Sequence, residues 1–207
     1  MIHGMTTGVA KAPEETRKKI LQAAYAEFYR SGFQGGSLNR IVHEAGTTKG
    51  ALFHHFEGKN DLGYAVLQEL IQPELKKRWF DSIAESIDPI EDIKRVFRQR
   101  IKDHIESGKL AEGCPLNNLA QEMSPLDEGF RQRIATFYDR WRQGLAGLFA
   151  RGIKMGNVRK DANPGTVAAF IVASQTGIMG TAKNSQSPDL MKQAAQGLFD
   201  YLDSLKP

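Results

Sequence analysis

The chain contains 207 residues, of which 41% are hydrophobic and 25% are charged. These proportions indicate a soluble globular protein of one or two domains that is large enough to bury a core. A single cysteine excludes an intramolecular disulfide, and the sequence holds no cluster that resembles a set of metal ligands. The first dozen residues lack the apolar run of a signal peptide or membrane anchor, so we expect a cytoplasmic protein.

The formal net charge of +4 is compatible with nucleic-acid binding but does not establish it. Residues 1–60 contain eight Lys and Arg residues against five Asp and Glu residues, together with four of the five histidines. The N-terminal part of the chain therefore carries a modest basic excess.

Helical periodicity predicts a first helix over residues 14–30. One face of that helix is apolar and consists of Ile20, Leu21, Ala24 and Phe28. The pair Ser31-Gly32 favours its end. We expect the preceding residues, 1–13, to form a flexible N-terminal arm.

Two short helices are predicted between residues 37 and 56. Ser37 is a suitable N-cap for the first, whose apolar face has the spacing i, i+3, i+4, i+7: Leu38, Ile41, Val42 and Ala45. Gly46 favours a tight turn after it. Thr47 and Thr48 begin the second helix, whose apolar side is expected to be Leu52, Phe53 and Phe56. Two short helices joined by a glycine turn indicate a helix-turn-helix motif.

The opposite side of the second helix is polar and basic. It consists of Thr47, Thr48, Lys49, His54 and His55, and Lys59 follows one turn later. Such a surface at the start of a protruding helix suits contact with the major groove of DNA. Periodicity alone leaves an ordinary helical hairpin with a solvated face as an equal alternative.

A dense motif lies between residues 16 and 67. It includes the segment A-G-T-T-K-G-A-L-F-H-H-F, and the pattern G-x-L-[YF]-x-H-F-x-x-K is present as Gly50, Leu52, Phe53, His55, Phe56 and Lys59. These residues resemble the DNA-binding domain of the TetR/AcrR family of bacterial repressors. Beyond residue 70 the resemblance is one of architecture and length only. It implies a regulator that binds double-stranded operator DNA as a homodimer.

The resemblance and side-chain chemistry together imply a set of DNA contacts. Ser37 and Lys59 are expected to hold phosphates. Phe53 stands where the family often has tyrosine, so it can touch a thymine methyl group but loses a phosphate hydrogen bond. Gly36, where relatives often carry threonine or alanine, weakens any contact just before Ser37. The expected DNA-binding residues are Ser37, Asn39, Thr47, Thr48, Lys49, Phe53, His54, His55 and Lys59.

A longer helix is predicted to begin at residues 59–61. Pro73 lacks a backbone donor and crowds the preceding turn, so we expect a kink or break there. The apolar pattern then resumes with Leu75, Trp79, Ile83 and Ile87. We place the domain boundary on this helix, between a DNA-binding domain over residues 14–72 and a ligand-binding and dimerisation domain over residues 73–207.

Four later helix starts are predicted where a capping residue precedes proline: Asp88-Pro89, Ser124-Pro125, Asn163-Pro164 and Ser187-Pro188. Gly152 is expected to end the helix that begins after Ser124. A short helix with Leu116, Leu119 and Met123 precedes it. No alternating strand pattern is present, so the predicted fold is all-α, with about nine helices.

The last two predicted helices, residues 164–183 and 188–205, carry many small residues. Small residues let helices approach closely, and two helices from each of two subunits can form a four-helix interface. The family resemblance implies the same, and a buried hairpin within one chain is the alternative. The expected interface residues are Phe170, Ser174, Gly177, Ile178, Leu190, Ala194, Leu198 and Tyr201.

Large apolar groups between residues 75 and 183, with a few polar ones, favour a small-molecule pocket, and a plain hydrophobic core is the alternative. The candidates are Trp79, Phe97, Ile101, His104, Asn117, Asn118, Phe137, Tyr138, Trp141, Phe170 and Gln175. Cys114, the sole thiol, could sense oxidants. No cation adjoins it in the sequence, which favours a buried, inert cysteine.

Catalytic motifs are missing from the sequence, which has no nucleophile elbow, phosphate-binding glycine loop or H-E-x-x-H helix. His54 and His55 are adjacent and point in different directions on a helix, so they cannot chelate one metal well. We expect neither an enzyme nor a cofactor. The sequence predicts a homodimeric transcriptional repressor that an unidentified small molecule releases from a palindromic operator. An activator, a ligand-independent regulator and a helical protein-interaction adaptor are the alternatives.

Overall fold

Residues 11–207 are the part of the chain that the computed structural model describes, and their regular secondary structure is entirely helical. Counting the continuous helical run from Lys59 to Trp79 as one, these residues form nine α-helices, and no strand occurs among them. The predicted all-α fold is confirmed. Of the arm expected over residues 1–13, residues 1–10 lie outside the described residues, and residues 11–13 belong to the first helix. The helices form two units, one up to Ile71 and one from Gln72 onward.

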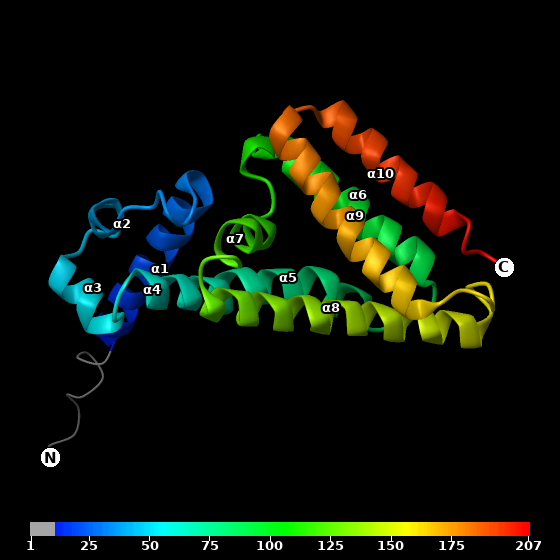
Figure 1. Ribbon diagram of the computed structural model, residues 1–207, viewed down its shortest axis with the longest axis horizontal. Helices are drawn as coiled ribbons and strands as arrows, with labels where there is room; N and C mark the ends of the chain where they lie inside the picture. Colours follow the sequence, from blue (N-terminus) through cyan, green and yellow to red (C-terminus); the bar gives the residue numbers. More distant parts are fainter. Residues whose placement is uncertain (1–10) are drawn as a thin grey trace, which may run out of the picture. The chain divides into compact units, whose positions relative to one another are not determined.

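The first unit is built from α1 (Lys11–Ser31), α2 (Leu38–Glu44), α3 (Lys49–His55) and α4 (Lys59–Val66) (Figure 1). α1 packs against each of the other three helices. The apolar face predicted for α1 is buried in this core: Ile20, Leu21, Ala24 and Phe28.

Two glycines between α1 and α2 are required by packing. A Cβ atom on Gly35 would lie 2.5 Å from the carbonyl oxygen of Ser31, and one on Gly36 would lie 2.6 Å from the ring of Phe28. Both distances are shorter than carbon atoms tolerate. A side chain at position 36 is therefore excluded by the core of the unit itself.

The helix that begins at Lys59 changes its hydrogen-bonding pattern just before Pro73. After α4 comes a π-helical turn, Leu67–Ile71, and α5 (Gln72–Trp79) then has Pro73 in its first turn. Proline has no N–H for the carbonyl four residues earlier, and its ring crowds that carbonyl, so a wider turn relieves both problems. The predicted disturbance at Pro73 thus takes the form of one π-helical turn.

Ile87 was expected to continue the buried face of α5, and this expectation is wrong. α5 ends at Trp79, and only a 3₁₀ turn, Asp81–Ile83, follows it. Ile83 is buried, but Ile87 lies in the connection to the next helix and is 68% exposed. A helical period cannot be extended beyond the residue at which the helix stops.

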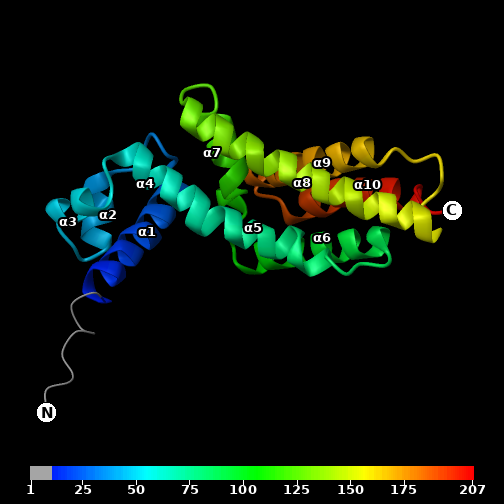
Figure 2. The same cartoon turned by 90° about the horizontal axis from the view of Figure 1, so that it is seen from below.

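The second unit contains α5 and five further α-helices, each of them longer than α5 (Figure 2). These are α6 (Pro89–Glu106), α7 (Pro115–Met123), α8 (Glu128–Met155), α9 (Pro164–Ser185) and α10 (Pro188–Asp203). α9 packs against both α8 and α10, α10 packs against α6, and α7 packs against α8. The core between them is rich in aromatic side chains.

Three of the four predicted helix starts are confirmed. Asp88, Asn163 and Ser187 are N-caps whose side chains accept backbone N–H groups of the next turn. The start predicted at Ser124-Pro125 is wrong, because α8 begins at Glu128. Asp127 caps α8 by accepting the Phe130 N–H at 2.8 Å.

Gly152 does not end α8, contrary to the prediction. The helix continues to Met155, and Gly156 ends it with a φ of +80°. A Cβ atom on Gly152 would lie 2.6 Å from the Pro89 ring and 2.8 Å from Val158. This glycine therefore serves the close packing of α8 on the start of α6.

α9 is long and apolar enough to cross a membrane by length and composition alone. Its inward face is buried in the bundle and includes Val167, Ile171, Ile178 and Met179. Because this face packs against α8 and α10, the apolar composition of α9 is explained by its place in a helical core.

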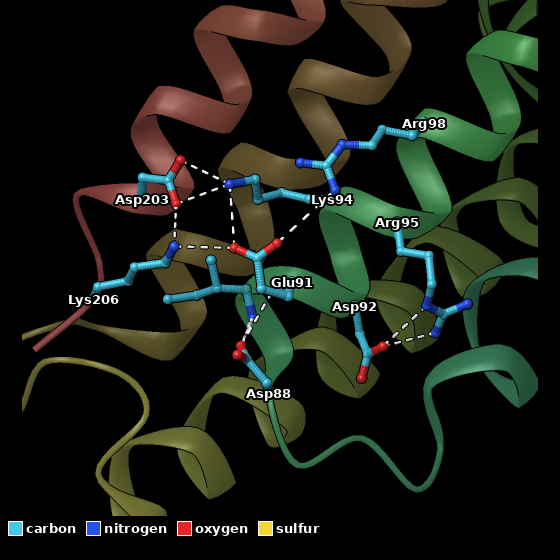
Figure 3. A network of polar contacts seen from close by, with 9 residues as sticks. Asp88, Glu91, Asp92, Lys94, Arg95, Arg98, Asp203 and Lys206 are labelled. Atoms are coloured by element: carbon cyan, nitrogen blue, oxygen red, sulfur yellow. Dashed lines mark hydrogen bonds and ion pairs between the residues drawn. The ribbon is translucent and has the colours of Figure 1, made fainter.

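The end of α10 is tied to the start of α6 by ion pairs (Figure 3). The buried ammonium of Lys94 lies 2.7 Å from Asp203 and 3.3 Å from Glu91. Lys206 lies 3.0 Å from Glu91 and 2.6 Å from Asp203. Leu205 between them is buried. Ion pairs and the burial of Leu205 thus hold residues 203–206 against the start of α6.

Candidate functional site

α2 is held by hydrogen bonds at both ends. At its start, Ser37 Oγ accepts the Arg40 N–H at 3.4 Å. At its end, Gly46 has a φ of +61°, and its N–H and that of Thr47 donate to the carbonyls of His43 and Val42, each at 3.1 Å. This is a Schellman turn, which glycine permits at little steric cost. The predicted glycine turn is confirmed, and it fixes where α3 begins.

α3 presents one face to the core and the other to solvent. Thr48 Oγ1 caps it by accepting the Ala51 N–H at 3.1 Å. Leu52 and Phe56 are buried, as predicted, but Phe53 is 52% exposed and does not belong to the apolar side. Leu52 and Phe56, four residues apart, form the seam that attaches α3, and Phe53 is rotated away from it.

A buried carboxylate joins α1 to the start of α2. Glu27 is 0% exposed. It accepts the Ser37 N–H at 2.9 Å, Arg40 Nε at 2.7 Å and an Arg30 guanidinium nitrogen at 2.8 Å. The Arg40 hydrogen bond, followed by those of Ser37 and Arg30, lowers the pKa of Glu27 to about 2 despite its burial. The ionised side chain therefore fixes the N-cap residue of α2.

The role of Glu27 was not predicted, although its position in the sequence indicated a buried site. It follows Ala24 by three residues and Ile20 by seven, so it lies on the apolar face of α1. An ionisable residue on such a face requires a polar partner. The partners, Arg30 and Arg40, could not be assigned without the fold.

The structure brings the nine predicted DNA-contact residues together in the first unit, on α2, α3 and the residues beside them. Most are exposed, and Ser37, Thr47, His55 and Lys59 are partly buried. The hydroxyls of Ser37 and Thr48 accept hydrogen bonds as caps, which uses an oxygen lone pair and leaves each O–H able to donate to a phosphate.

Two of these residues also interact within the chain. Lys59 Nζ donates to the Gln34 carbonyl at 2.9 Å and lies 5.1 Å from the ring centroid of Phe33. A phosphate contact by Lys59 therefore requires its ammonium to share or leave that carbonyl. Burial, reinforced by the charges of His54 and Arg17, lowers the pKa of His55.

Known protein families match both units. The family described as "Bacterial regulatory proteins, tetR family" matches residues 20–66, and "Tetracyclin repressor-like, C-terminal domain" matches residues 90–198. The chain belongs to the TetR family.

Individual relatives agree with this assignment. The chain is 24% identical over 195 residues to the HTH-type transcriptional repressor DhaR of Mycobacterium sp. (strain GP1), with 94% of each protein covered. It is 31% identical over 128 residues to the HTH-type transcriptional regulator LmrA of Bacillus subtilis, covering 61% of this chain and 67% of LmrA. A TetR-family regulator from Cytophaga hutchinsonii shares the fold, with a TM-score of 0.85 at 19% identity over 99% of this chain and 98% of its own.

Membership of the TetR family identifies the chain as a DNA-binding transcriptional regulator and not an enzyme. Regulators of this family are soluble, bind operator DNA and act as homodimers with small-molecule ligands. The capped helices α2 and α3 lie within the first matched region. The second unit of this TetR-family chain holds the residues predicted for assembly and ligand binding.

α9 and α10 share an outer face of small and aromatic residues. Phe170 is 44% exposed, and its ring centroid lies 4.5 Å from that of Tyr201. A Cβ atom on Gly177, Gly180 or Gly197 would meet no atom of the described residues within 4 Å. Glycine weakens a helix by about 1 kcal/mol relative to alanine. Packing among residues 11–207 does not account for these three glycines.

Six of the eight predicted interface residues are at least partly exposed on α9 and α10: Phe170, Ser174, Gly177, Leu190, Ala194 and Tyr201. The other two, Ile178 and Leu198, are buried against the chain's own helices. Both are next to an outward-facing residue in sequence and therefore point toward a different side of the helix.

Aromatic rings predicted to line a pocket form one cluster in this TetR-family unit. Trp79 has its ring centroid 5.0 Å from Phe97 and 4.9 Å from Trp141. Trp141 in turn lies 6.3 Å from Phe137 and stacks on Tyr138 at 6.2 Å. Three helices, α5, α6 and α8, contribute these rings.

Several buried polar atoms in this unit have no hydrogen-bond partner among the described residues. They include the indole nitrogens of Trp79 and Trp141, Nε2 of His104, and both amide atoms of Gln175. A buried polar group without a partner costs about 1–3 kcal/mol. Burial, reinforced by nearby cations, lowers the pKa of His104 to about 4, so its imidazole is neutral at pH 7. The interior thus departs from a plain apolar core.

The remaining pocket candidates lie elsewhere or are already bonded. Phe170 is on the outer face of α9, not in the interior. Asn118 donates to the Glu112 carbonyl at 2.7 Å and accepts from Lys183 at 3.2 Å. Asn117 is half-buried on α7, and Ile101 lines a groove between α6 and α10. Cys114 is buried at the N-cap of α7.

Proposed function

We propose that this TetR-family regulator is a homodimeric repressor that leaves a palindromic operator when a small molecule binds within its second unit. The observation that carries the DNA-binding half of the proposal is the outer face of α3. Thr48, Lys49, Phe53 and His54 are exposed there, while Leu52 and Phe56 hold the helix on its core. The protein would act in the cytoplasm, where its operator lies.

A direct test replaces Lys49, which is exposed and makes no ion pair among the described residues. Lys49→Ala should weaken binding to operator DNA and lower the slope of log affinity against log salt by about one, as expected for one lost phosphate contact. If Lys49 reads a base edge, sequence preference relaxes instead. Fluorescence anisotropy with DNA from upstream of the gene measures both effects.

Lys160→Ala is the matched control, because Lys160 is exposed in the connection between α8 and α9. Equal losses of affinity in the two variants would contradict the assigned face. Footprinting should show two half-sites whose centres are about 34–36 Å apart, or a multiple of that distance.

The glycines on the outer face of α9 and α10 support a homodimer, since a partner chain could approach closest where side chains are missing. Gly177→Arg should place a charge in that interface and dissociate the dimer. Gly147→Arg is the matched control, because Gly147 is an exposed glycine of α8 at which an added Cβ also has no atom of the described part of the chain within 4 Å. Light scattering distinguishes the two variants, and an intact Gly177→Arg dimer would place the interface elsewhere.

The aromatic cluster and the unpartnered polar atoms support an effector site in the interior of the second unit. Its polar groups are indole N–H groups, an amide and a neutral imidazole, so an uncharged ring compound with hydrogen-bonding groups fits this chemistry. The effector must prefer the conformation that does not bind the operator. A thermal-shift screen followed by operator titration tests the proposal; stabilising compounds that never alter operator affinity would contradict release.

A further inference from the structure

A groove with a volume of about 390 Å³ runs between α6 and α10 on the second unit. Its floor is apolar, with Ile101 and Ile105 from α6 and with Ala195 and Phe199 from α10. The ring of Phe199 meets Phe97 edge-on, with centroids 6.4 Å apart, so the floor is continuous with the core. The groove shares no residue with the outer face of α9 and α10 described above.

The rim of the groove carries three cations, Arg98, Lys102 and Lys192, whereas Glu106 is the only carboxylate among the lining residues. Lys102 has Glu106 as a partner at 3.9 Å, and Lys192 has Asp189 at 3.6 Å. These pairs are long and exposed, so they hold the ammonium groups weakly. Both lysines remain able to attract another anion.

Figure 3 shows Arg98 beside the ion pairs that join α6 to the residues at the end of α10, with one long contact of its own. Its carboxylate neighbour, Glu91, is 3.9 Å away. Glu91 and Asp203 are already shared between the ammonium groups of Lys94 and Lys206, all at 3.3 Å or less. Two carboxylates therefore balance two lysines, and the charge of Arg98 is in excess.

The Arg98 guanidinium is also held at the edge of the groove, 5.2 Å from the ring centroid of Phe199. A guanidinium over an aromatic face keeps its N–H groups directed outward from its edge. An apolar floor thus adjoins a positioned cation that matches carboxylate or phosphate oxygens.

We propose that this groove binds an amphiphilic organic anion, namely a short apolar chain that ends in a single carboxylate or phosphate head group. The chain would lie along the floor and displace water from Ile105, which is partly exposed, and from the small exposed parts of Ile101 and Phe199. The head group would bind Arg98, with Lys102 and Lys192 adding attraction. Glu106 at the rim disfavours a second anionic group elsewhere on the ligand. The site is separate from the interior effector site and does not depend on it.

Isothermal titration calorimetry of the full chain with octanoate tests the proposal. Octanoate should bind at one site per chain, and Arg98→Gln should weaken it by about tenfold, the usual effect of losing one charge-assisted hydrogen bond. Arg98 is exposed, so the variant should fold normally. Arg140→Gln, at an exposed position of α8 outside the groove, is the matched control and should bind as the wild type does.

Acetate and 1-octanol separate the two halves of the proposal, because each carries only one feature of the ligand. Either one binding as tightly as octanoate would overturn it, as would equal affinities for Arg98→Gln and Arg140→Gln. Loss of octanoate binding in Gln175→Leu would assign it to the interior instead. Octyl phosphate identifies the head group: whichever anion binds more tightly names the class, and binding of neither at millimolar concentration refutes the site.

Discussion

Glu27 in the first unit and Gln175 in the second are both buried polar side chains, 0% and 1% exposed, but their surroundings differ. Both oxygens of Glu27 accept hydrogen bonds, from a backbone N–H and two arginines. Neither amide atom of Gln175 has a partner among the described residues. A satisfied buried group stabilises one arrangement, whereas an unsatisfied one favours any molecule that supplies its partner.

The difference matches what each unit has to do. The first unit must present α2 and α3 in one geometry, and Glu27 fastens α1 to the residue that caps α2. The second unit is proposed to exist in two states, and an interior with unmet hydrogen-bonding capacity can be shifted by a ligand. Replacing the buried polar residue by an apolar one should therefore lower the stability of the first unit and raise that of the second.

The largest effect is expected at Glu27. Glu27→Ala removes a buried charge that compensates Arg30 and Arg40 and leaves the Ser37 N–H without its partner, which should cost about 3–4 kcal/mol. Both tryptophans of the chain lie in the second unit. The far-UV circular dichroism transition should therefore move more than the tryptophan fluorescence transition.

Glu44→Ala is its control, since Glu44 pairs with the same Arg30 at 3.0 Å but is itself exposed. Its cost should stay below about 1 kcal/mol. Equal destabilisation by both variants would show that the burial of Glu27 does not cause the larger loss of stability expected for Glu27→Ala.

The second effect is a loss of stability on mild acidification, carried by His104. Its folded pKa of about 4 lies below the usual 6.5, so the unfolded chain binds a proton first. Stability is complete above pH 6.5 and falls as the pH drops toward 4, by about 2 kcal/mol between pH 6.5 and 4.5. His104 is the only histidine of the second unit, so tryptophan-detected urea unfolding isolates it.

In His104→Leu the slope between pH 6.5 and 4.5 should vanish. A slope that persists would assign the effect to other groups. Glu27 should act in a lower window, because its pKa is lowered to about 2: its stabilisation is present above pH 4.5 and is lost as the pH falls toward 2. The contribution of His104 should thus be lost at a higher pH than that of Glu27.

The smallest effect has the opposite sign. Gln175→Leu replaces an unpartnered buried amide by an apolar group of similar size and should stabilise the second unit by about 1 kcal/mol. The same change should weaken any effector that bonds this amide. A rise in the tryptophan-detected unfolding midpoint together with a weaker ligand response is expected; destabilisation would mean that the amide is satisfied in solution.

Sequence alone predicted most of the fold, because caps and helical spacing are local signals. Asp88, Asn163 and Ser187 each stand before a proline at a helix start, and each is an N-cap in the structure. The helix start predicted at Ser124 was wrong because Asp127, three residues later, is the N-cap of α8. The helix end predicted at Gly152 was wrong because the sequence does not distinguish a glycine required for close packing from one required for a turn.

Less of the candidate site than of the fold could be predicted from the sequence. The exposed residues of α3 followed from periodicity, except Phe53, which lies beside the apolar seam and not in it. The Glu27 contacts depend on Arg40, thirteen residues away, and on the fold that brings the two together. Missing partners, as at Gln175, appear only when every neighbour is placed.

The contacts of the residues that follow α10 have a consequence for how the second unit opens. Lys206 closes two ion pairs, and Leu205 is buried with its carbonyl accepting the Arg159 N–H at 2.8 Å. Loss of these contacts would leave the Glu91 and Asp203 carboxylates with Lys94 and the more distant Arg98 as their cations, and it would uncover an apolar patch. Contacts of this kind set the free energy of local opening at the edge of a unit. Amide hydrogen exchange in the last turn of α10 should therefore report an opening of this edge before the second unit unfolds as a whole.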